Sequence, residues 1–238
     1  MSHIGIIGGT GFKDCSQFEI ENKIEEHTSW GTPSSALYEG TMGEKEVILL
    51  LRHGPDHNIP PHRINHRANI YAMQERVEEI IGVCSAGALD PDIEVPSISA
   101  PADYVNFWDP PTFYDEKIKH VTPELSLKLR KQIIQSSEEL GIDLTSEDLV
   151  YVQTRGPRLE TKAEVRILSN FGDLVGMTMA SEATLCKECD VDYAGIVTID
   201  NYANGIKDET VEYDEIVETA KNRSEDVLGI LERFLKKR

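Results

Sequence analysis

The chain has 238 residues, of which 39% are hydrophobic and 28% are charged, a composition typical of one globular domain with a full core. Its formal net charge of −18 argues against a general affinity for nucleic acid, which requires clustered Lys and Arg. No apolar stretch approaches the ~18 residues of a membrane span, and no secretion signal is recognisable, so we expect a cytoplasmic protein with reduced cysteines.

Short apolar runs alternate with amphipathic segments along the chain. Strands are expected at residues 4–7, 46–51, 80–84, 149–154, 174–178 and 194–199. Helices are expected at residues 67–79, 123–140, 163–170, 181–189 and 212–237, and Gly141 is expected to end the second of them. This alternation predicts an α/β layered fold. Because no repeat or low-complexity linker interrupts it, we expect a single domain over residues 1–238.

The first strand runs into a glycine-rich turn, IIGGTGF at residues 6–12. Glycines expose backbone N–H groups and let a ligand approach the main chain, so this turn could hold an anion. The turn matches neither the dinucleotide fingerprint nor the ATPase phosphate loop. If it holds an anion, it does so with backbone amides and the Thr10 hydroxyl.

Polar or small residues follow the other apolar runs. Ligands of open α/β sheets bind at the carboxyl ends of the strands. The residues at those ends are Arg52 and His53, Cys84 to Gly87, Met177 and Thr178, and Asn201. Their hydroxyl, amide and cationic groups suit an anionic and polar ligand.

The stretch LRHGPDHNIPPHRINHRANIYAM, residues 51–73, concentrates histidines and arginines. A metal site is one interpretation, because two pairs of histidines are spaced four apart. Pro60 and Pro61 would break a helix that presented both pairs, and Arg52, Arg63 and Arg67 would repel a cation. An anion site is favoured because guanidinium groups match phosphate oxygens. Purely structural histidines remain the third interpretation.

Other motifs are weak when each is taken alone. Glu160 and Glu164 lie four apart and could face one side of a helix, or pair with neighbouring cations. Asn201 after a buried strand often only makes a turn. Cys186 and Cys189 form a lone C-x-x-C, for which we expect no metal or redox role because no second pair completes a set.

Taken in order, these motifs resemble a known family. IIGGTGF, RHG…H…P…N…ANI, SAGAL, GPR-x-E-T-x-AE and GMT…E are similar to motifs of the trimeric-type purine nucleoside phosphorylases and methylthioadenosine phosphorylases. The resemblance runs from residue 4 to about residue 234. It implies an α/β domain around a mixed β-sheet flanked by helices, assembled as a homotrimer or a dimer of trimers. It also implies that the glycine turn wraps inorganic phosphate as co-substrate, with no cofactor and no metal.

The resemblance assigns site residues one by one. The implied phosphate site consists of Thr10, Arg52, His53, Ser85, Ala86 and Thr178, with Cys84 beside it. Met177 would lie against the ribose, and Glu160, Asn201, Tyr202 and Ala203 would surround the base. Glu160, Asn201 and His53 are the implied catalytic residues.

Two departures indicate which purine is used. Family members that act on methylthioadenosine typically carry Ser near the G-P-R motif and a D-x-D pair late in the chain, whereas this chain carries Glu160 and Asn201. That pair is typical of the 6-oxopurine enzymes. An ionised carboxylate accepts from the N1–H of hypoxanthine or guanine, but it meets a lone pair on adenine N1.

The sequence therefore predicts phosphorolysis of guanosine and inosine in purine salvage. A methylthioinosine or methylthioadenosine phosphorylase is the alternative, and a nucleoside sensor without turnover is a further one. Tyr213 aligns with the position that selects the 5′ group of the sugar, and its bulk favours a free 5′-hydroxyl over a methylthio group. No nucleic acid or membrane partner is expected.

Overall fold

A computed structural model describes residues 3–9, 17–145, 148–208, 219 and 223–238 of the chain. The strands are β1 (His3–Gly8), β2 (Phe18–Ile24), β3 (Leu37–Met42), β4 (Lys45–Leu51), β5 (Val77–Ala88), β6 (Ser97–Ser99), β7 (Asp103–Asn106), β8 (Leu144–Thr145), β9 (Val150–Gln153), β10 (Leu174–Gly176) and β11 (Asp192–Tyr202). The helices are α1 (His66–Met73), α2 (Leu127–Leu140), α3 (Lys162–Leu168), α4 (Met179–Glu188) and α6 (Ser224–Leu235), and a short 3₁₀ helix covers Pro61–Arg63. Within these ranges, no helix is long and apolar enough to cross a membrane.

The strands form one mixed β-sheet, with the order β2-β3-β4-β1-β5-β10-β9-β7, and β11 pairs with β5 outside this path. Strands β4, β1, β5 and β11 run parallel to their neighbours in this group. The carboxyl ends of these strands therefore meet at one edge of the sheet, where α/β folds bind ligands. This confirms the expected α/β architecture with a central mixed sheet.

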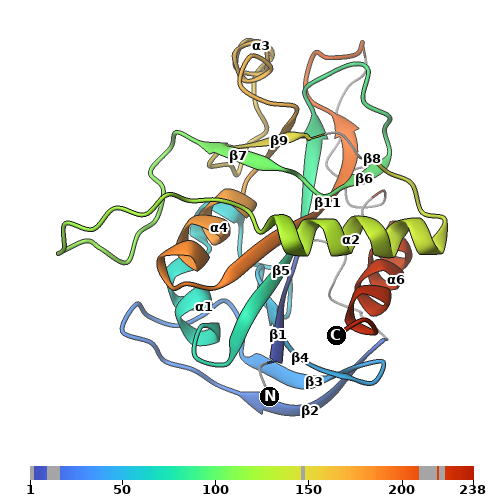
Figure 1. Cartoon of the computed structure of the whole chain (residues 1–238). Coiled ribbons are helices and arrows are strands. Elements are labelled where there is room, and N and C mark those ends of the chain that lie inside the picture. Colours follow the sequence, from blue (N-terminus) through green and yellow to red (C-terminus); the bar gives the residue numbers. More distant parts are fainter. Residues whose placement is uncertain (1–2, 10–16, 146–147, 209–218, 220–222) are drawn as a thin grey trace.

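Helices cover both faces of the sheet (Figure 1). On one face, α1 and α4 contribute Ile70, Met73, Met179 and Cys186 to an apolar core. On the other face, α2 and α6 cross the sheet side by side and bury residues such as Phe234 against it. Burial of these side chains removes apolar area from water at roughly 25 cal/mol per Å², which makes the two cores the main stabilising contribution.

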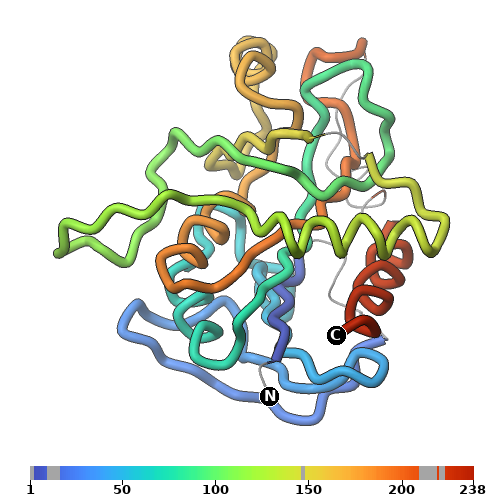
Figure 2. Tube along the Cα trace, viewed as in Figure 1, coloured from blue at the N-terminus to red at the C-terminus, as the bar shows by residue number. Residues whose placement is uncertain are grey.

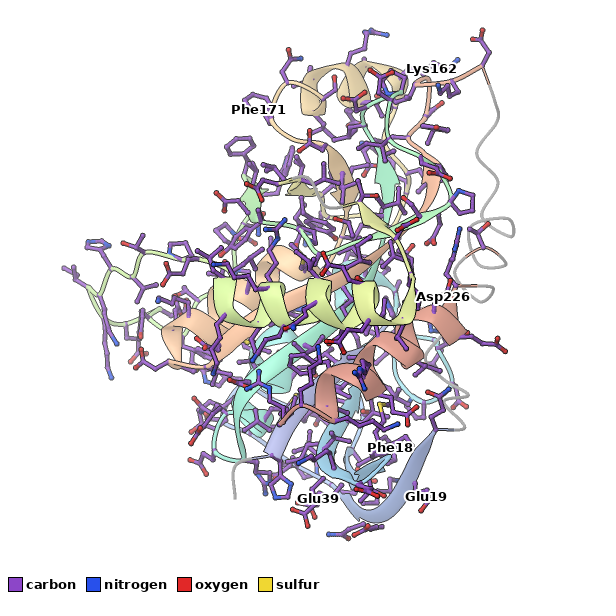
Figure 3. All side chains as sticks on the ribbon, turned by 45° about the vertical axis from the view of Figure 1, so that its right-hand side comes forward. Phe18, Glu19, Glu39, Lys162, Phe171 and Asp226 are labelled. Atoms are coloured by element: carbon purple, nitrogen blue, oxygen red, sulfur yellow. The ribbon has the colours of Figure 1, made fainter. Side chains whose placement is uncertain are left out.

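The upper part of the molecule, in the view of Figure 1, is a smaller layer that frames the site. Helix α3 packs over β9 and β10, with Val165, Leu168, Val152 and Val175 in a third cluster (Figures 1 and 2). At the opposite end of the sheet, Figure 3 shows Glu19 and Glu39 on the outer strands β2 and β3. Charged side chains on an edge strand oppose pairing with a further strand.

Several elements differ from the sequence-based expectation. The helix expected at 67–79 ends at Met73, because the segment from Val77 onward is the start of β5. The strand expected at 80–84 is longer than predicted, since β5 begins at Val77 and continues through Ala88. Gly141 does end α2, with a left-handed φ of 68° that suits glycine. Of the closing helix expected at 212–237, residues 212–218 and 220–222 lie outside the described ranges, and α6 covers Ser224–Leu235.

Candidate active site

A cavity of about 540 Å³ opens at the carboxyl edge of the parallel strands. This volume suits a small-molecule ligand. Nine of the residues expected in the site line it: Arg52, His53, Ser85, Ala86, Glu160, Met177, Thr178, Asn201 and Ala203. They come from five different segments of the chain. Thr10 and Tyr213 lie outside the described residues, so the structure says nothing of their expected roles.

Gly9 follows β1 at this edge, and its lack of a side chain has a packing reason. A Cβ atom at Gly9 would lie 2.5 Å from the Val83 carbonyl oxygen and 2.7 Å from Arg52 Nη1. The first turn of the predicted anion loop is thus pressed against β5 and the Arg52 guanidinium. Part of the glycine signature therefore reflects close packing within the protein, besides any approach of a ligand.

Arg52 directly follows β4, and each of the three nitrogens of its guanidinium donates to a protein group. Arg52 Nε donates to Glu182 Oε1 at 2.5 Å, and Nη2 donates to Glu182 Oε2 at 2.9 Å. Nη1 donates to the Val83 carbonyl at 2.8 Å. Both side chains are buried. We expected the Arg52 fork to grip a phosphate, but the Glu182 carboxylate occupies that fork.

A network of polar groups surrounds this ion pair. The Tyr193 hydroxyl donates to Glu182 Oε2 at 2.8 Å, and His66 Nδ1 lies 3.9 Å from Glu182 Oε1. Burial lowers the pKa of Arg52, whereas Cys84 and the Glu182 carboxylate raise it, and the net effect is a raised pKa. Burial raises the pKa of the Cys84 thiol. Arg52 therefore stays charged while the Cys84 thiol beside it stays neutral.

His53 lines the cavity as a neutral imidazole. Burial, together with the positive charge of Arg52, lowers the pKa of His53 to about 4. Its Nδ1 lies 2.8 Å from the Ile59 carbonyl oxygen, which can only accept a hydrogen bond. Nδ1 thus carries the proton, and Nε2 is the acceptor of the ring.

Thr178 is the N-cap residue of α4 and lines the same cavity. Its hydroxyl lies 3.6 Å from Cys84 Sγ, and its backbone N–H donates to the Tyr151 hydroxyl at 3.3 Å. The N-terminus of a helix favours an anion, because its first N–H groups point outward and the helix dipole is positive there. The backbone N–H groups of Thr178 and Ser181 donate to Tyr151 and Gln153, so this end of the cavity suits phosphate through the Thr178 side chain and the positive end of the helix dipole.

Glu160 lies at the other end of the cavity, in the segment that leads into α3. Its Oε1 accepts from the Thr154 hydroxyl at 2.5 Å, and within the described residues no hydrogen bond is recorded for Oε2, which can accept from a ligand. Thr161, directly after Glu160, is the N-cap of α3 and forms a capping box with Glu164. Glu164 pairs with Arg158 at the surface. Only Glu160 of the two carboxylates reaches the cavity.

Met177 forms part of the cavity wall next to Gly156. The φ of Gly156 is 65°, and a Cβ atom there would lie 2.4 Å from Met177 Sδ. Glycine is required at this position for both its conformation and its contact. The G-P-R motif therefore supports the methionine that we expect against the ribose.

Asn201 reaches the cavity because of an irregularity in β11. The register between β11 and β5 shifts between Ile199, which pairs with Ala86, and Asn201, which pairs with Gly87. Asp200 is the extra residue of this bulge, a feature that re-aims side chains at functional sites. Asn201 Nδ2 donates to the Tyr202 carbonyl at 2.7 Å, so its Oδ1 is left as an acceptor.

Two expectations for site residues do not match the observed positions. Tyr202 does not line the cavity, because its hydroxyl donates to the Ile93 carbonyl at 2.8 Å and its ring packs against the core. Of the three arginines expected around an anion, only Arg52 reaches the cavity. Arg67 instead pairs with Asp115 and covers Trp30 beside a neighbouring hollow, which Arg63 also lines.

Two buried carboxylates at the site were not identified from the sequence. Glu182 belongs to the GMT…E motif, but nothing in its spacing indicated that it pairs with Arg52. Asp200 lies behind Ser85, and the Ser85 hydroxyl donates to Asp200 Oδ2. Their acidic side chains inside predicted core elements were the available signal, because buried carboxylates need a partner.

Comparisons with known proteins identify the family of the chain. The sequence model of the family described as the phosphorylase superfamily matches residues 3–236 of this chain. The chain is 40% identical to a probable 6-oxopurine nucleoside phosphorylase of Archaeoglobus fulgidus, over 98% of this chain and 96% of that protein. It is 38% identical to a probable S-methyl-5′-thioinosine phosphorylase of Methanocaldococcus jannaschii, over 98% of this chain and 91% of that one.

Solved structures give the same result for the fold. The methylthioadenosine phosphorylase of Schistosoma mansoni, in complex with adenine, superimposes with a TM-score of 0.87 at 26% identity, covering 100% of this chain and 92% of that one. With the matched family, the relatives and the fold in agreement, the chain belongs to the phosphorylase superfamily.

Proposed function

We propose that this protein cleaves 6-oxopurine nucleosides, guanosine and inosine, with inorganic phosphate to give the free base and ribose 1-phosphate. One observation carries the proposal: a buried carboxylate, Glu160, lies in the same cavity as the anion-suited residues at the start of α4. A 6-oxopurine needs an acceptor such as the Glu160 carboxylate, and phosphate needs the anion-suited residues at the start of α4. A relative from Pyrococcus furiosus that is 36% identical is named 6-oxopurine nucleoside phosphorylase.

The base end of the cavity supports the choice of purine. Glu160 Oε2 can accept from the N1–H of hypoxanthine, or from N1–H and N2–H₂ of guanine. Adenine has no hydrogen on N1, so the carboxylate would stay buried and unpaired. Such a mismatch lowers kcat/KM by a factor of 10⁴ or more in well-built sites, on the order of several kcal/mol. Asn201 Oδ1 is placed to accept from N7–H of the leaving purine.

The proposed reaction needs no covalent intermediate on the protein. Phosphate attacks C1′ of the ribose from below while the bond to the purine breaks, and the electron pair of that bond leaves with the base. A proton from water neutralises the departing purine at N7, Asn201 Oδ1 accepts a hydrogen bond from the N7–H so formed, and the α4 N-terminus holds the phosphate. Positioning and electrostatic stabilisation supply the rate acceleration. We expect no metal or cofactor to be required.

A second candidate is S-methyl-5′-thioinosine phosphorylase, because several relatives at 34–38% identity carry that name. This substrate has the same 6-oxopurine and differs only at the 5′ position of the sugar. We propose that Tyr213, which lies outside the described residues, selects the 5′-hydroxyl. Glu160 argues against a methylthioadenosine phosphorylase, because its carboxylate does not suit adenine. The anion end of the cavity argues against a nucleoside sensor without turnover, because a sensor does not need to bind phosphate.

The deciding experiment is a panel of nucleosides assayed with and without phosphate. We expect phosphate-dependent release of base from guanosine and inosine, and almost none from adenosine. A higher kcat/KM for methylthioinosine than for inosine would move the assignment to the second candidate, and Tyr213→Val should shift the ratio in that direction. Nucleoside binding without turnover would support the sensor. We also propose a homotrimer or a dimer of trimers, which light scattering would measure.

A further inference from the structure

The hydroxyl of Ser85 has a fixed hydrogen-bond direction. Ser85 lines the cavity, and behind it Asp200 is buried and does not line the cavity. The Ser85 hydroxyl contacts Asp200 Oδ2. An ionised carboxylate can only accept, so the single hydroxyl proton of Ser85 is committed to Asp200. What Ser85 can offer to a ligand is therefore a lone pair.

The fold explains why these two side chains meet. Ser85 pairs with Thr198 in the parallel ladder of β5 and β11, and Asp200 lies two residues further along β11. Side chains two residues apart share a face of a strand, and the bulge at Asp200 adjusts its direction. Asp200 Oδ1 is buried and has no hydrogen-bond partner in the described part of the chain. Such buried unpaired carboxylate oxygens are rare in proteins and call for an explanation.

We propose that Asp200 is a positioning residue that takes the Ser85 proton and thereby makes Ser85 an acceptor for a hydroxyl group of the bound substrates. This inference rests on the proposed phosphorolysis. Hydrogenphosphate brings one hydroxyl on phosphorus, and the nucleoside brings the ribose hydroxyls. We assign the Ser85 acceptor to hydrogenphosphate, because the preceding residue, Cys84, contacts two groups at the anion end. Its sulfur lies 3.4 Å from Arg52 Nη2 and 3.6 Å from Thr178 Oγ1.

An acceptor in an anion site has a chemical consequence. Hydrogenphosphate can donate its hydroxyl proton to Ser85, whereas sulfate at neutral pH has no proton and would place an oxygen against a lone pair. The Ser85–Asp200 pair would thus favour phosphate over sulfate, two anions of similar size and charge. His53 Nε2 is a second acceptor of the cavity, so the test must separate the hydroxyls that reach Ser85.

The test compares wild type with Asp200→Asn and Ser85→Ala at pH 8, where Asp200 is ionised because burial raises its pKa only to about 6. The measured ratio is the Ki of sulfate, as a competitor of phosphate, divided by the KM of phosphate. Asn can donate to Ser85 and release its proton towards the ligand, and Ala removes the acceptor altogether. We expect the ratio to fall by about tenfold or more in both variants, the effect of roughly one hydrogen bond.

A matched control is Asp173→Asn. Asp173 also accepts a hydrogen bond, from the backbone N–H of Val150 at 2.7 Å, and it does not line the cavity. We expect the ratio of the sulfate Ki to the phosphate KM in Asp173→Asn to equal that of wild type. A general loss of packing would weaken phosphate and sulfate together, so it would not move the ratio.

A second arm measures kcat/KM for inosine against 2′-, 3′- and 5′-deoxyinosine in the same proteins. In one outcome, the preference for inosine over one of the deoxyinosines falls about tenfold in both variants, while the ratio of the sulfate Ki to the phosphate KM does not change. Ser85 then accepts from the ribose, and the assignment to phosphate is wrong. If neither ratio changes by more than about twofold, the positioning role of Asp200 is refuted. If wild type releases no base, the proposed function fails. The affinities for phosphate, sulfate and the inosines, measured by calorimetry, then still decide the role of Asp200.

Discussion

Arg52 and Glu182 form a bidentate ion pair in which both side chains are buried, with N–O distances of 2.5 and 2.9 Å. Arg52 lines the cavity, and the pair joins the end of β4 to α4. Its charges cancel, so the anion end of the cavity cannot rely on a free guanidinium. The α4 dipole and the Thr178 side chain at its N-terminus become the main attraction for phosphate.

The first prediction is that Arg52→Ala destabilises the fold in addition to raising the KM of phosphate. Removing one partner leaves the Glu182 carboxylate buried and uncompensated, which typically costs about 3–5 kcal/mol. Urea unfolding would measure the loss. Arg52→Met combined with Glu182→Gln should recover at least half of it, since Gln still accepts from Tyr193. As a control, Arg158→Ala removes an exposed pair with Glu164 and should change stability little. Equal losses of the free energy of unfolding in Arg52→Ala and Arg158→Ala would contradict this prediction.

The second prediction concerns acid sensitivity at His66. Burial lowers the pKa of His66 to about 4, below its ordinary value of 6.5. As the pH falls from 6.5 to 4, the unfolded chain takes up a proton that the folded state refuses, so stability decreases in that window. The contribution is on the order of 3 kcal/mol. His66→Phe should therefore lose less stability than wild type between pH 7 and pH 4.

Unfolding curves at several pH values would check this slope. His120→Gln is the matched control, because His120 is exposed and should leave the pH dependence unchanged. His53 contributes in the same direction, since its pKa is also lowered to about 4. The His66 variant should consequently remove only part of the acid sensitivity, and a slope identical to that of wild type would show that His66 is not buried as described.

The third prediction has the opposite sign and concerns Asp200. Burial raises the pKa of Asp200 from 3.8 to about 6, while the Ser85 and Thr198 hydroxyls lower it partly. The folded state then holds the proton more tightly than the unfolded chain, so this group reduces stability as the pH rises from about 4 to 6. Asp200→Asn should gain stability over wild type at pH 8, up to the order of 3 kcal/mol, and little at pH 4. A variant that is less stable at pH 8 would overturn this account.

The strands that carry the site were predictable because their signals are local. Apolar runs ending in Arg52, Ser85 or Asn201 marked the carboxyl ends of strands, and parallel pairing brought them together. The exact length of β5 was missed, since Ser85, Ala86 and Gly87 are turn-forming residues that a central strand accommodates by pairing on both sides. Here tertiary context overrode local propensity.

The partners of buried polar groups could not be predicted from the sequence. Arg52 and Glu182 are 130 residues apart, and only the packing of α4 against the end of β4 makes them meet. The Ser85–Asp200 contact depends on a bulge whose position no pattern in the sequence indicates. Glu160 was identified by resemblance to a motif, whereas its hydrogen bond from Thr154 follows from the geometry of the loop before α3.

The last prediction tests the base end of the cavity through Glu160→Gln. Gln keeps the size of the side chain and can still accept from Thr154, but the group facing the ligand can become an N–H₂ donor. Such a donor meets the lone pair of adenine N1 favourably and opposes the N1–H of hypoxanthine. We expect kcat/KM for inosine to fall by about 100-fold or more, and the inosine-to-adenosine ratio to narrow strongly. Steady-state assays with both nucleosides measure this ratio. Glu164→Gln, four residues further on and facing Arg158 at the surface, should leave it unchanged. If Glu160→Gln lowered the activity on both nucleosides equally, Glu160 would be supporting the loop before α3 and would not be reading the purine.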